Sequence, residues 1–259
     1  MEILLKKQNG LVRIVEWFGE FGLFVGRSLR TGITSRYQIK ELLRQMDEIG
    51  SKSIALVMLT GAALGVVMSI HLRDSLVRFG AEAALPAVIV LAIVKESGPI
   101  ITALVVSGRV AAGIGAELGS MKVTEQLDAL EASAIDPYCF LVVPRVLACI
   151  LMLPLLTIIA DFFGVVMGWV SNAVVAPISF QLFLTQGFKS VTFGDLIPST
   201  LRTTIFGFII GMISCFEGMR TEGGTEGVGR STKTAVVLSA LFVILADVFL
   251  VKIILILFE

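Results

Sequence analysis

Five apolar stretches, each about as long as a helix that crosses a bilayer, constrain this 259-residue sequence more than any other feature. A membrane-spanning helix needs about 20 consecutive apolar residues, because the hydrocarbon core is about 30 Å thick and a helix rises about 1.5 Å per residue. We place the predicted spans at residues 53–70, 83–106, 143–170, 200–216 and 234–258. No segment has the period-two alternation of a strand. The sequence therefore predicts an all-α, polytopic membrane protein with five transmembrane helices.

The composition agrees with a membrane domain and gives little support to other classes. Hydrophobic residues make up 56% of the chain and charged residues 16%, whereas soluble domains have about 45–50% and about 25%. Lys plus Arg and Asp plus Glu both number 21, so the net charge gives no reason to expect nucleic acid as a partner. The three cysteines lie in or beside apolar stretches without CxxC spacing, which indicates packing residues rather than disulfides or metal ligands.

An enzyme active site is poorly supported. The only histidine is His71, at the end of the first span, and no serine stands in a nucleophile elbow. A site built from several histidines therefore cannot form, and we expect neither a metal nor a cofactor to be bound by this chain.

Residues 1–50 are predicted to form amphipathic helices that lie at the membrane interface. Apolar residues recur at helical spacing from Leu11 to Leu29 and again from Arg36 to Ile49, where Gly50 is expected to end the second helix. The alternative is an ordinary helix packed on its neighbours. The region lacks the layout of a signal peptide, so we expect the first span to remain as an anchor.

The basic residues are distributed unequally between the two sides of the predicted bundle. Fifteen Lys and Arg residues fall in residues 1–52, in the loop after the second span with its flanks, and in the Gly-rich segment before the last span, against five on the other side. Basic loops are retained in the cytoplasm. We therefore predict a cytoplasmic N-terminus and, with an odd number of spans, a C-terminus on the outer side.

Charged residues inside the apolar stretches are the sharpest candidates for a functional role. A charge at the centre of a membrane helix costs about 2.5–3.5 kcal/mol, so each must face a partner, a cavity or the surface. Lys95 and Glu96 precede a Gly-Pro pair, where proline removes a helix hydrogen bond and allows a kink. Such irregular backbone commonly lines a substrate path, and a structural ion pair is the alternative. For Asp161 and Asp247 we favour the structural ion pair.

Two glycine patterns have structural interpretations. Residues 61–65 and 207–211 contain GxxxG pairs, which let helices approach closely, either within this chain or between two copies. Residues 224–231 nearly match the phosphate-binding loop GxxxxGK[ST]. However, Arg230 replaces the lysine and no strand precedes the motif. We therefore expect a tight cytoplasmic turn and no nucleotide binding.

The long polar segment after the second span, residues 108–142, is predicted to contain a short amphipathic helix outside the membrane. Its apolar face contains Leu127 and Leu130, and its acidic face is made of Glu117, Glu125, Asp128 and Glu131. This pattern has two interpretations. It is either a solvated acidic surface or the element on which a cytoplasmic partner with a basic groove docks.

Several short motifs together resemble the signature of the MlaE/YrbE permeases. They are Lys95-Glu96-Ser97-Gly98-Pro99, Ser107-Gly108-Arg109, Gly115-Ala116-Glu117-Leu118-Gly119 and Thr124-Glu125-Gln126-Leu127-Asp128-Ala129-Leu130, followed by Asp136-Pro137, Pro144-Arg145 and the Gly-rich segment 223–232. The resemblance covers the chain from about Gly50 to its end. This sequence departs from the family at Lys95, where arginine is frequent, and at Asp161, which is not a family hallmark.

The resemblance implies the membrane subunit of an ABC transporter that moves phospholipid between the inner and outer membranes of Gram-negative bacteria. The chain would lie in the inner membrane with its C-terminus in the periplasm. The implied partners are a second copy of the chain, a cytoplasmic ATPase that carries ATP and Mg²⁺, and a periplasmic ring of MCE-domain proteins. Residues 117–131 would couple the chain to the ATPase, and Val67, Met68 and His71 would border the lipid pocket together with the last span.

Polar residues outside these regions are expected to be structural, with Arg109 joining Asp161 and Asp247 in that role. Two other functions remain open. An ion-coupled secondary transporter would use Lys95, Glu96, Asp161 and Asp247 as a relay and would need no ATPase. A non-transporting membrane scaffold would leave lipid distribution unchanged when it is deleted.

Overall fold

A computed structural model describes residues 10–34, 38–189 and 193–258, which form helices joined by short turns. No strand occurs within these ranges, and five helical segments are long and apolar enough to cross a membrane. They are Ile39–Arg78, Glu82–Val123, Tyr138–Val175, Leu196–Met219 and Gly224–Ile254. The predicted all-α fold with five spans is therefore confirmed. Lys6, Lys7 and Arg36, which contribute to the predicted charge asymmetry, lie outside the described residues.

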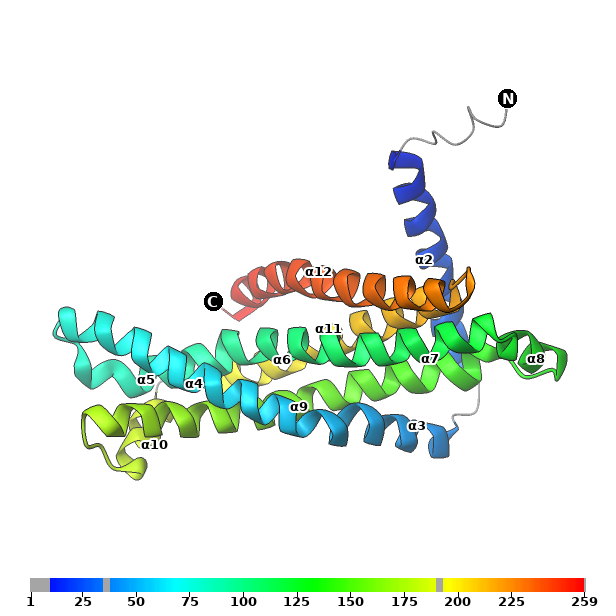
Figure 1. The fold of residues 1–259 in the computed structure, drawn as a ribbon. Coiled ribbons are helices and arrows are strands. Elements are labelled where there is room, and N and C mark those ends of the chain that lie inside the picture. The colour runs from blue at the N-terminus through cyan, green and yellow to red at the C-terminus, as the bar shows by residue number, and fades with distance from the viewer. Residues whose placement is uncertain (1–9, 35–37, 190–192, 259) are drawn as a thin grey trace.

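The spans alternate in direction, so their connections gather at two ends of an elongated bundle (Figure 1). α8 (Gln126–Ala132) lies at one end and α10 (Phe180–Lys189) at the other, and we name the two ends after these helices. The α8 end also holds α2 (Gly10–Thr34) and the turn that joins α11 (Phe193–Met219) to α12 (Gly224–Phe258). The three polar segments that the sequence assigned to one side thus share one end.

The first span is continuous with the helix before it. α3 (Ile39–Met46) passes through a π-helical turn, η1 (Asp47–Ser51), directly into α4 (Lys52–Arg78). The prediction that Gly50 ends the preceding helix is therefore wrong. A Cβ on this glycine would lie 2.0 Å from Cε of Met152, so Gly50 serves close packing against the third span rather than helix termination.

The second span consists of several helical segments in line, and it extends well past its predicted end at Val106. After the short helix η2 (Glu82–Ala84) come α5 (Leu85–Ala92), the π-turn η3 (Ile93–Ser97), α6 (Gly98–Val106), the π-turn η4 (Ser107–Ala111) and α7 (Ala112–Val123). Residues 108–123, predicted as loop, are therefore helical. Ile114 and Leu118 of α7 are buried in the core, and Gly115 lets α7 pack closely against Thr232 of α12.

The third span is the central helix of the bundle. It begins with the π-turn η5 (Tyr138–Val142) and continues as α9 (Val143–Val175), which packs against both α4 and α11. A Cβ on Gly65 would lie 1.9 Å from the carbonyl oxygen of Gly164, and one on Gly207 would lie 2.5 Å from that of Cys149. Both GxxxG pairs therefore bring helices of this same chain together.

The N-terminal helix α2 lies at a steep angle to the bundle (Figure 1) and is fastened to it by one face. Nε1 of Trp17 donates a hydrogen bond to Oε1 of Glu217 at 2.8 Å, and the guanidinium of Arg27 lies 4.1 Å from the ring centroid of Tyr138. Val15, on the opposite face, is 69% exposed. The helix thus combines a packed face with an exposed apolar face, as an interfacial helix does.

The Gly-rich segment before the last span is shorter than its predicted extent, Glu217 to Lys233. Only residues 220–223 separate α11 from α12, and Gly223 and Gly224 adopt φ angles of 89° and 70°. These left-handed conformations suit glycine, because other residues have a Cβ clash there. The sequence that nearly matches a phosphate-binding loop therefore lies in the first turns of a transmembrane helix.

Candidate functional site

Four π-helical turns interrupt the helices in the part of the chain that the structure describes, and charged side chains lie at or beside each of them. The turns are η1, η3, η4 and η5. A π-turn adds an extra residue to a helix and disturbs its regular hydrogen bonding, and such turns are frequent at functional sites. The neighbouring charged residues include Glu48, Glu96, Arg109 and Arg145.

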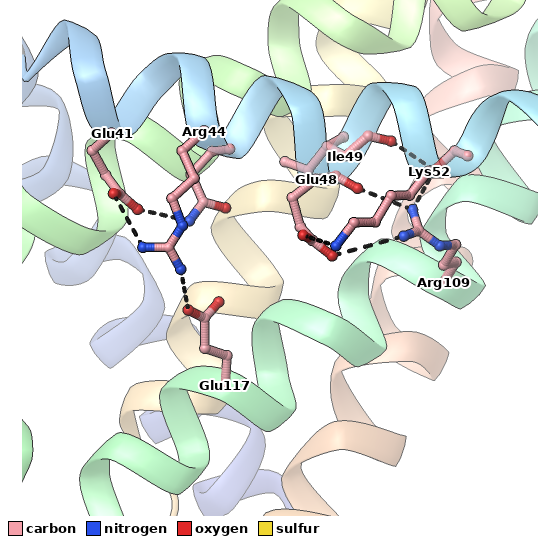
Figure 2. A network of polar contacts seen from close by, with 9 residues as sticks. Glu41, Arg44, Glu48, Ile49, Lys52, Arg109 and Glu117 are labelled. Atoms are coloured by element: carbon pink, nitrogen blue, oxygen red, sulfur yellow. Dashed lines mark hydrogen bonds and ion pairs between the residues drawn. The ribbon is translucent and has the colours of Figure 1, made fainter.

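Glu117 of α7 joins three helices at the α8 end. Its carboxylate lies 2.8 Å from Nη2 of Arg145 on α9 and 4.0 Å from Nη2 of Arg44 on α3. Figure 2 shows the Arg44 side of this junction. Arg145 is only 1% exposed, and its Nη1 also donates to the carbonyl oxygen of Leu141 in η5 at 2.9 Å. A buried guanidinium is thus held by one carboxylate and one carbonyl.

Arg109 of η4 ties the second span to the first. Its Nη1 donates to Oγ of Ser53 at 2.6 Å and to the carbonyl oxygen of Glu48 at 3.2 Å, and its Nη2 lies 3.9 Å from the Glu48 carboxylate (Figure 2). The Glu48 carboxylate is also in close contact with Nζ of Lys52. Two π-turns, η1 and η4, therefore face each other across a network of opposite charges.

The predicted coupling helix is interrupted, and this corrects its expected extent. α7 ends at Val123 and α8 begins at Gln126, because Glu125 adopts a left-handed φ of 58° between them. Glu117 therefore belongs to the second span rather than to the acidic face of α8. At the other end of α8, Ala134 also has a φ of 58°.

The short helix α8 is attached through its apolar side and presents its acidic side. Leu127 is 4% exposed, and Leu130 packs against the same core. Glu125, Asp128 and Glu131 are exposed, although Asp128 is engaged by Nζ of Lys122 at 3.0 Å. Within the part of the chain that the structure describes, no ion pair engages Glu125, just before α8, or Glu131 within it, so these two carboxylates are the ones presented to a partner.

The Glu96 carboxylate of η3 lies beside Arg202 of α11, which is one of the five basic residues assigned above to the outer side. Nη1 of Arg202 lies 3.2 Å from Oδ1 of Asp247 on α12 and 3.6 Å from Oε2 of Glu96. Arg202 and Asp247 are buried, at 3% and 4% exposed. The side chains of Glu96 and Asp247 thus share one cation.

Arg202 also repairs the backbone that Pro99 disrupts. Proline has no N–H, so it cannot donate to the carbonyl four residues earlier, which belongs to Lys95. Nη2 of Arg202 donates to that carbonyl at 2.6 Å and to the carbonyl of Glu96 at 3.3 Å. In a membrane, side chains of neighbouring helices commonly re-satisfy backbone groups freed by proline. Arg202 therefore stabilises the irregular part of the second span.

Asp161 of α9 lies against the same irregular segment. A Cβ on Gly98 would lie 1.8 Å from Oδ1 of Asp161, so this carboxylate is packed directly on the glycine of the Lys-Glu-Ser-Gly-Pro motif. The oxygen is buried and has no hydrogen-bond partner among the described residues. The Asp161 carboxylate can occupy this position only because residue 98 is a glycine and has no Cβ.

The residues predicted to border a lipid pocket lie on the outer surface of α4. Val67 and His71 are exposed and Met68 is half-buried, in the half of α4 nearer the α10 end. On this surface they are not enclosed by the single chain. Among the described residues, no group of three or more His, Cys, Asp or Glu side chains is placed to hold a metal ion.

Two buried arginines that organise these contacts, Arg145 and Arg202, were not among the predicted site residues. Arg202 stands near the start of an apolar stretch, and Arg145 follows Pro144 at the start of another. Their positions within predicted spans were the available signal, because a guanidinium in a membrane helix must have partners. The partners lie far away in sequence and could not be assigned from it.

Comparison with known proteins shows a clear family relationship. Residues 42–253 match the family described as Permease MlaE. A probable ABC transporter permease protein of Rickettsia typhi is 35% identical over 236 residues, covering 91% of each chain. A probable ABC transporter permease protein of Synechocystis is 38% identical over 218 residues, covering 84% of this chain and 83% of the relative.

A plant protein is also similar. The chloroplastic protein named trigalactosyldiacylglycerol 1 of Arabidopsis thaliana is 34% identical over 208 residues, which covers 80% of this chain and 59% of the plant protein. The shared region includes most of the five-span bundle, because it exceeds three quarters of the chain.

Proposed function

The chain belongs to the MlaE family of ABC transporter permeases, and from that premise we propose that it moves phospholipid between the inner and outer membranes of a bacterial envelope. A permease subunit is not itself the ATPase of such a transporter. The motive force therefore comes from a separate cytoplasmic ATPase, which binds ATP and Mg²⁺. In this proposal the α8 end faces the cytoplasm and the α10 end faces the periplasm, in accord with the distribution of basic residues.

The geometry of α8 is the observation that carries the coupling proposal. The helix lies at one extremity of the bundle (Figure 1) and is anchored there by Leu127. The exposed carboxylates of Glu125, just before the helix, and Glu131, within it, face outward from this extremity. A protruding acidic element complements a basic groove on a partner. We assign α8 as the docking element for the ATPase.

Glu117 gives α8 a mechanical connection to the spans. α7 leads directly into α8, and the Glu117 carboxylate on α7 holds Arg145 of α9 at 2.8 Å and Arg44 of α3 at 4.0 Å. A displacement of α8 by the ATPase would therefore pull on the first and third spans through α7. We infer that this junction transmits the ATP-driven movement into the membrane.

Several features favour a lipid as the cargo. The outer surfaces of the spans carry many exposed apolar side chains. The last span is the least buried of the five, because only 22% of its apolar 18-residue window is buried inside the chain. The name of the Arabidopsis relative refers to a galactolipid. We propose that a second copy of the chain and a periplasmic ring of MCE-domain proteins complete the path, with Val67, Met68, His71 and the last span bordering the lipid.

The ion-coupled alternative is less well supported by the geometry. A proton relay needs carboxyl groups that exchange partners during transport. Asp247 and Glu96 instead share the buried Arg202, which is also bound to two backbone carbonyls. This fixed arrangement favours a structural role for the cluster.

Co-purification of the ATPase tests the proposal. The chain is expressed from its own chromosome with an affinity tag, and stoichiometric ATPase is measured in the purified complex. We expect ATPase to be retained by the wild type and lost from the variant with Glu125→Lys and Glu131→Lys. Asp128 is left unchanged because it is paired with Lys122.

The matched control is Glu82→Lys, which reverses an exposed charge at the α10 end. It is expected to retain the ATPase. Retention of the ATPase by the α8 double variant, with normal folding, would show that α8 is not the docking element.

A further inference from the structure

A cavity of about 310 Å³ lies between the first and second spans at the α8 end. Its charged lining consists of Arg44, Glu48, Arg109 and Glu117, and its remaining walls come from α3, η1, η4 and α7. We name it the α3–α7 cavity. Figure 2 shows its charged residues converging from the two facing helices. Both walls contain a π-turn, a feature that is frequent at functional sites.

The carboxylates around the α3–α7 cavity already have close cationic partners. Glu117 is held by Arg145 at 2.8 Å, and Glu48 is in close contact with Lys52. Four cations surround three carboxylates when Glu41 is included, which leaves a formal net charge of +1. The cations are Arg44, Lys52, Arg109 and Arg145, and the carboxylates are those of Glu41, Glu48 and Glu117. An anion would balance this charge.

The two arginines that line the cavity hold their carboxylate partners only at long range. Arg44 lies 3.5 Å from Glu41 and 4.0 Å from Glu117, and Arg109 lies 3.9 Å from the Glu48 carboxylate. Charge-assisted hydrogen bonds normally measure about 2.7–2.9 Å. Among the described residues, no carboxylate engages either guanidinium at close range. Nη1 of Arg109 already donates to Ser53 and to the Glu48 carbonyl, so the donors left for a ligand are those of Arg44 and the Nη2 group of Arg109.

The cavity lies at the depth where phospholipid headgroups occur. The apolar part of α4 lies between Lys52 and Asp74. These two residues are roughly 33 Å apart along the helix at 1.5 Å per residue, which is close to the hydrocarbon thickness of about 30 Å. Arg44 and Glu48 lie just beyond Lys52, in line with the same helix. Ile39 and Leu43, still further along, are 67% and 59% exposed, as expected for a helix that continues through the interface.

We propose that the α3–α7 cavity binds the phosphate of a phospholipid in the leaflet on the α8 side, with Arg44 and Arg109 as its ligands. Guanidinium groups match the geometry of phosphate oxygens and bind them with two hydrogen bonds each. The proposal rests on the proposed transport of phospholipid and adds a headgroup site far from Val67, Met68 and His71. Such a site would hold lipid before it enters, or after it leaves, the transport path.

Calorimetric titration of the purified full-length chain in maltoside detergent tests the proposal without ATP or ATPase. The probes are dihexanoylphosphatidylglycerol below its micellar concentration, inorganic phosphate, and dihexanoylglycerol, which has the same chains without phosphate. We expect saturable binding of the phospholipid that weakens at least about tenfold in Arg44→Gln, because the variant loses a charge-assisted hydrogen bond to the phosphate. Arg44→Lys is expected to lose less.

The matched control is Arg78→Gln. Arg78 is exposed, forms an ion pair with Asp74 at 2.9 Å and lies at the other end of the same helix. It should bind the phospholipid as the wild type does. Arg109→Gln is a second test, and Arg44→Gln stands alone if loss of the Ser53 contact prevents that variant from folding.

Three outcomes would overturn the assignment. Equal phospholipid affinity in Arg44→Gln and Arg78→Gln would show that Arg44 is not a ligand. Inorganic phosphate that binds as tightly as the phospholipid would identify a site for a free anion. Loss of co-purifying ATPase from Arg44→Gln with unchanged lipid affinity would make Arg44 a protein contact. Equal affinities, or tight binding of inorganic phosphate, would remove the headgroup site and leave the docking of ATPase at Glu125 and Glu131 to its own co-purification test, so the two proposals fail separately.

Discussion

The ion pair between Glu117 and Arg145 permits a quantitative test of how the α8 end is held together. Arg145 is 1% exposed, its Nη2 lies 2.8 Å from the Glu117 carboxylate, and its Nε has no hydrogen-bond partner among the described residues. Replacing Glu117 with glutamine leaves this guanidinium without a counter-charge. We therefore expect Glu117→Gln to lower stability much more than the loss of a surface ion pair.

The magnitude follows from the burial of the two partners. Breaking a fully buried pair by removing one partner costs about 3–5 kcal/mol. The Glu117 side chain is 40% exposed, and Arg145 keeps its bond to the carbonyl of Leu141. We therefore expect a loss of about 2–3 kcal/mol. At about 2–4 °C per kcal/mol for a chain of this size, the midpoint of thermal unfolding falls by roughly 4–12 °C.

A double-mutant cycle isolates the interaction. Glu117→Gln, Arg145→Met and the double variant are compared by thermal unfolding in detergent, followed by circular dichroism. The double variant should be more stable than the sum of the single changes predicts, by about 1–2 kcal/mol, because neither partner is then left uncompensated. Asp74→Asn, which breaks the exposed pair with Arg78, is the matched control and should cost less than about 1 kcal/mol. Additive single effects, or a Glu117→Gln midpoint equal to that of Asp74→Asn, would refute the reasoning.

Three further predictions concern other contacts and use the same unfolding measurement. Gly65→Ala places a Cβ 1.9 Å from the carbonyl oxygen of Gly164 and should lower the free energy of unfolding by about 1–3 kcal/mol. Gly113→Ala, whose Cβ would have no heavy atom within 4 Å, is the control and should be neutral or stabilising. Equal unfolding midpoints for the two variants would contradict close packing of α4 on α9. Arg202→Met should lower the free energy of unfolding by about 3–5 kcal/mol, because it leaves the carboxylates of Asp247 and Glu96 without their cation. Adding Asp247→Asn should recover part of this loss. No recovery would show that Arg202 and Asp247 are not energetically coupled. Ala134→Gly should raise stability by about 1 kcal/mol, because φ is 58° at this position; a lower midpoint would show that the left-handed conformation is not a source of strain.

The existence of the spans could be predicted from the sequence because apolar length is a local property. Their ends could not, because they depend on contacts between distant residues. Ser107 and Arg109 suggested a loop, yet they are helical, since Oγ of Ser107 donates to the carbonyl of Leu104 and Arg109 reaches Ser53 on another helix. Gly50 suggested a helix end, but its role is to admit the side chain of Met152.

The candidate site shows the same division between local and long-range information. Lys95, Glu96 and Asp247 were identified because each is a charge within an apolar stretch. Arg202, the cation that the carboxylates of Glu96 and Asp247 share, was missed, since these carboxylates lie on two other helices. The acidic face of α8 was predicted from its spacing, but the left-handed turn at Glu125 separates Glu117 from it. Helical periodicity contains no information about such a break.

Reconstituted lipid transfer tests the central claim most directly. The chain and its co-purified ATPase are placed in proteoliposomes with a fluorescent phospholipid, and ATP-dependent loss of that lipid to acceptor vesicles is measured. The account predicts transfer that requires ATP and the ATPase together and that is lost in the variant with Glu125→Lys and Glu131→Lys. Transfer by the chain alone under an ion gradient, without ATPase or ATP, would contradict it.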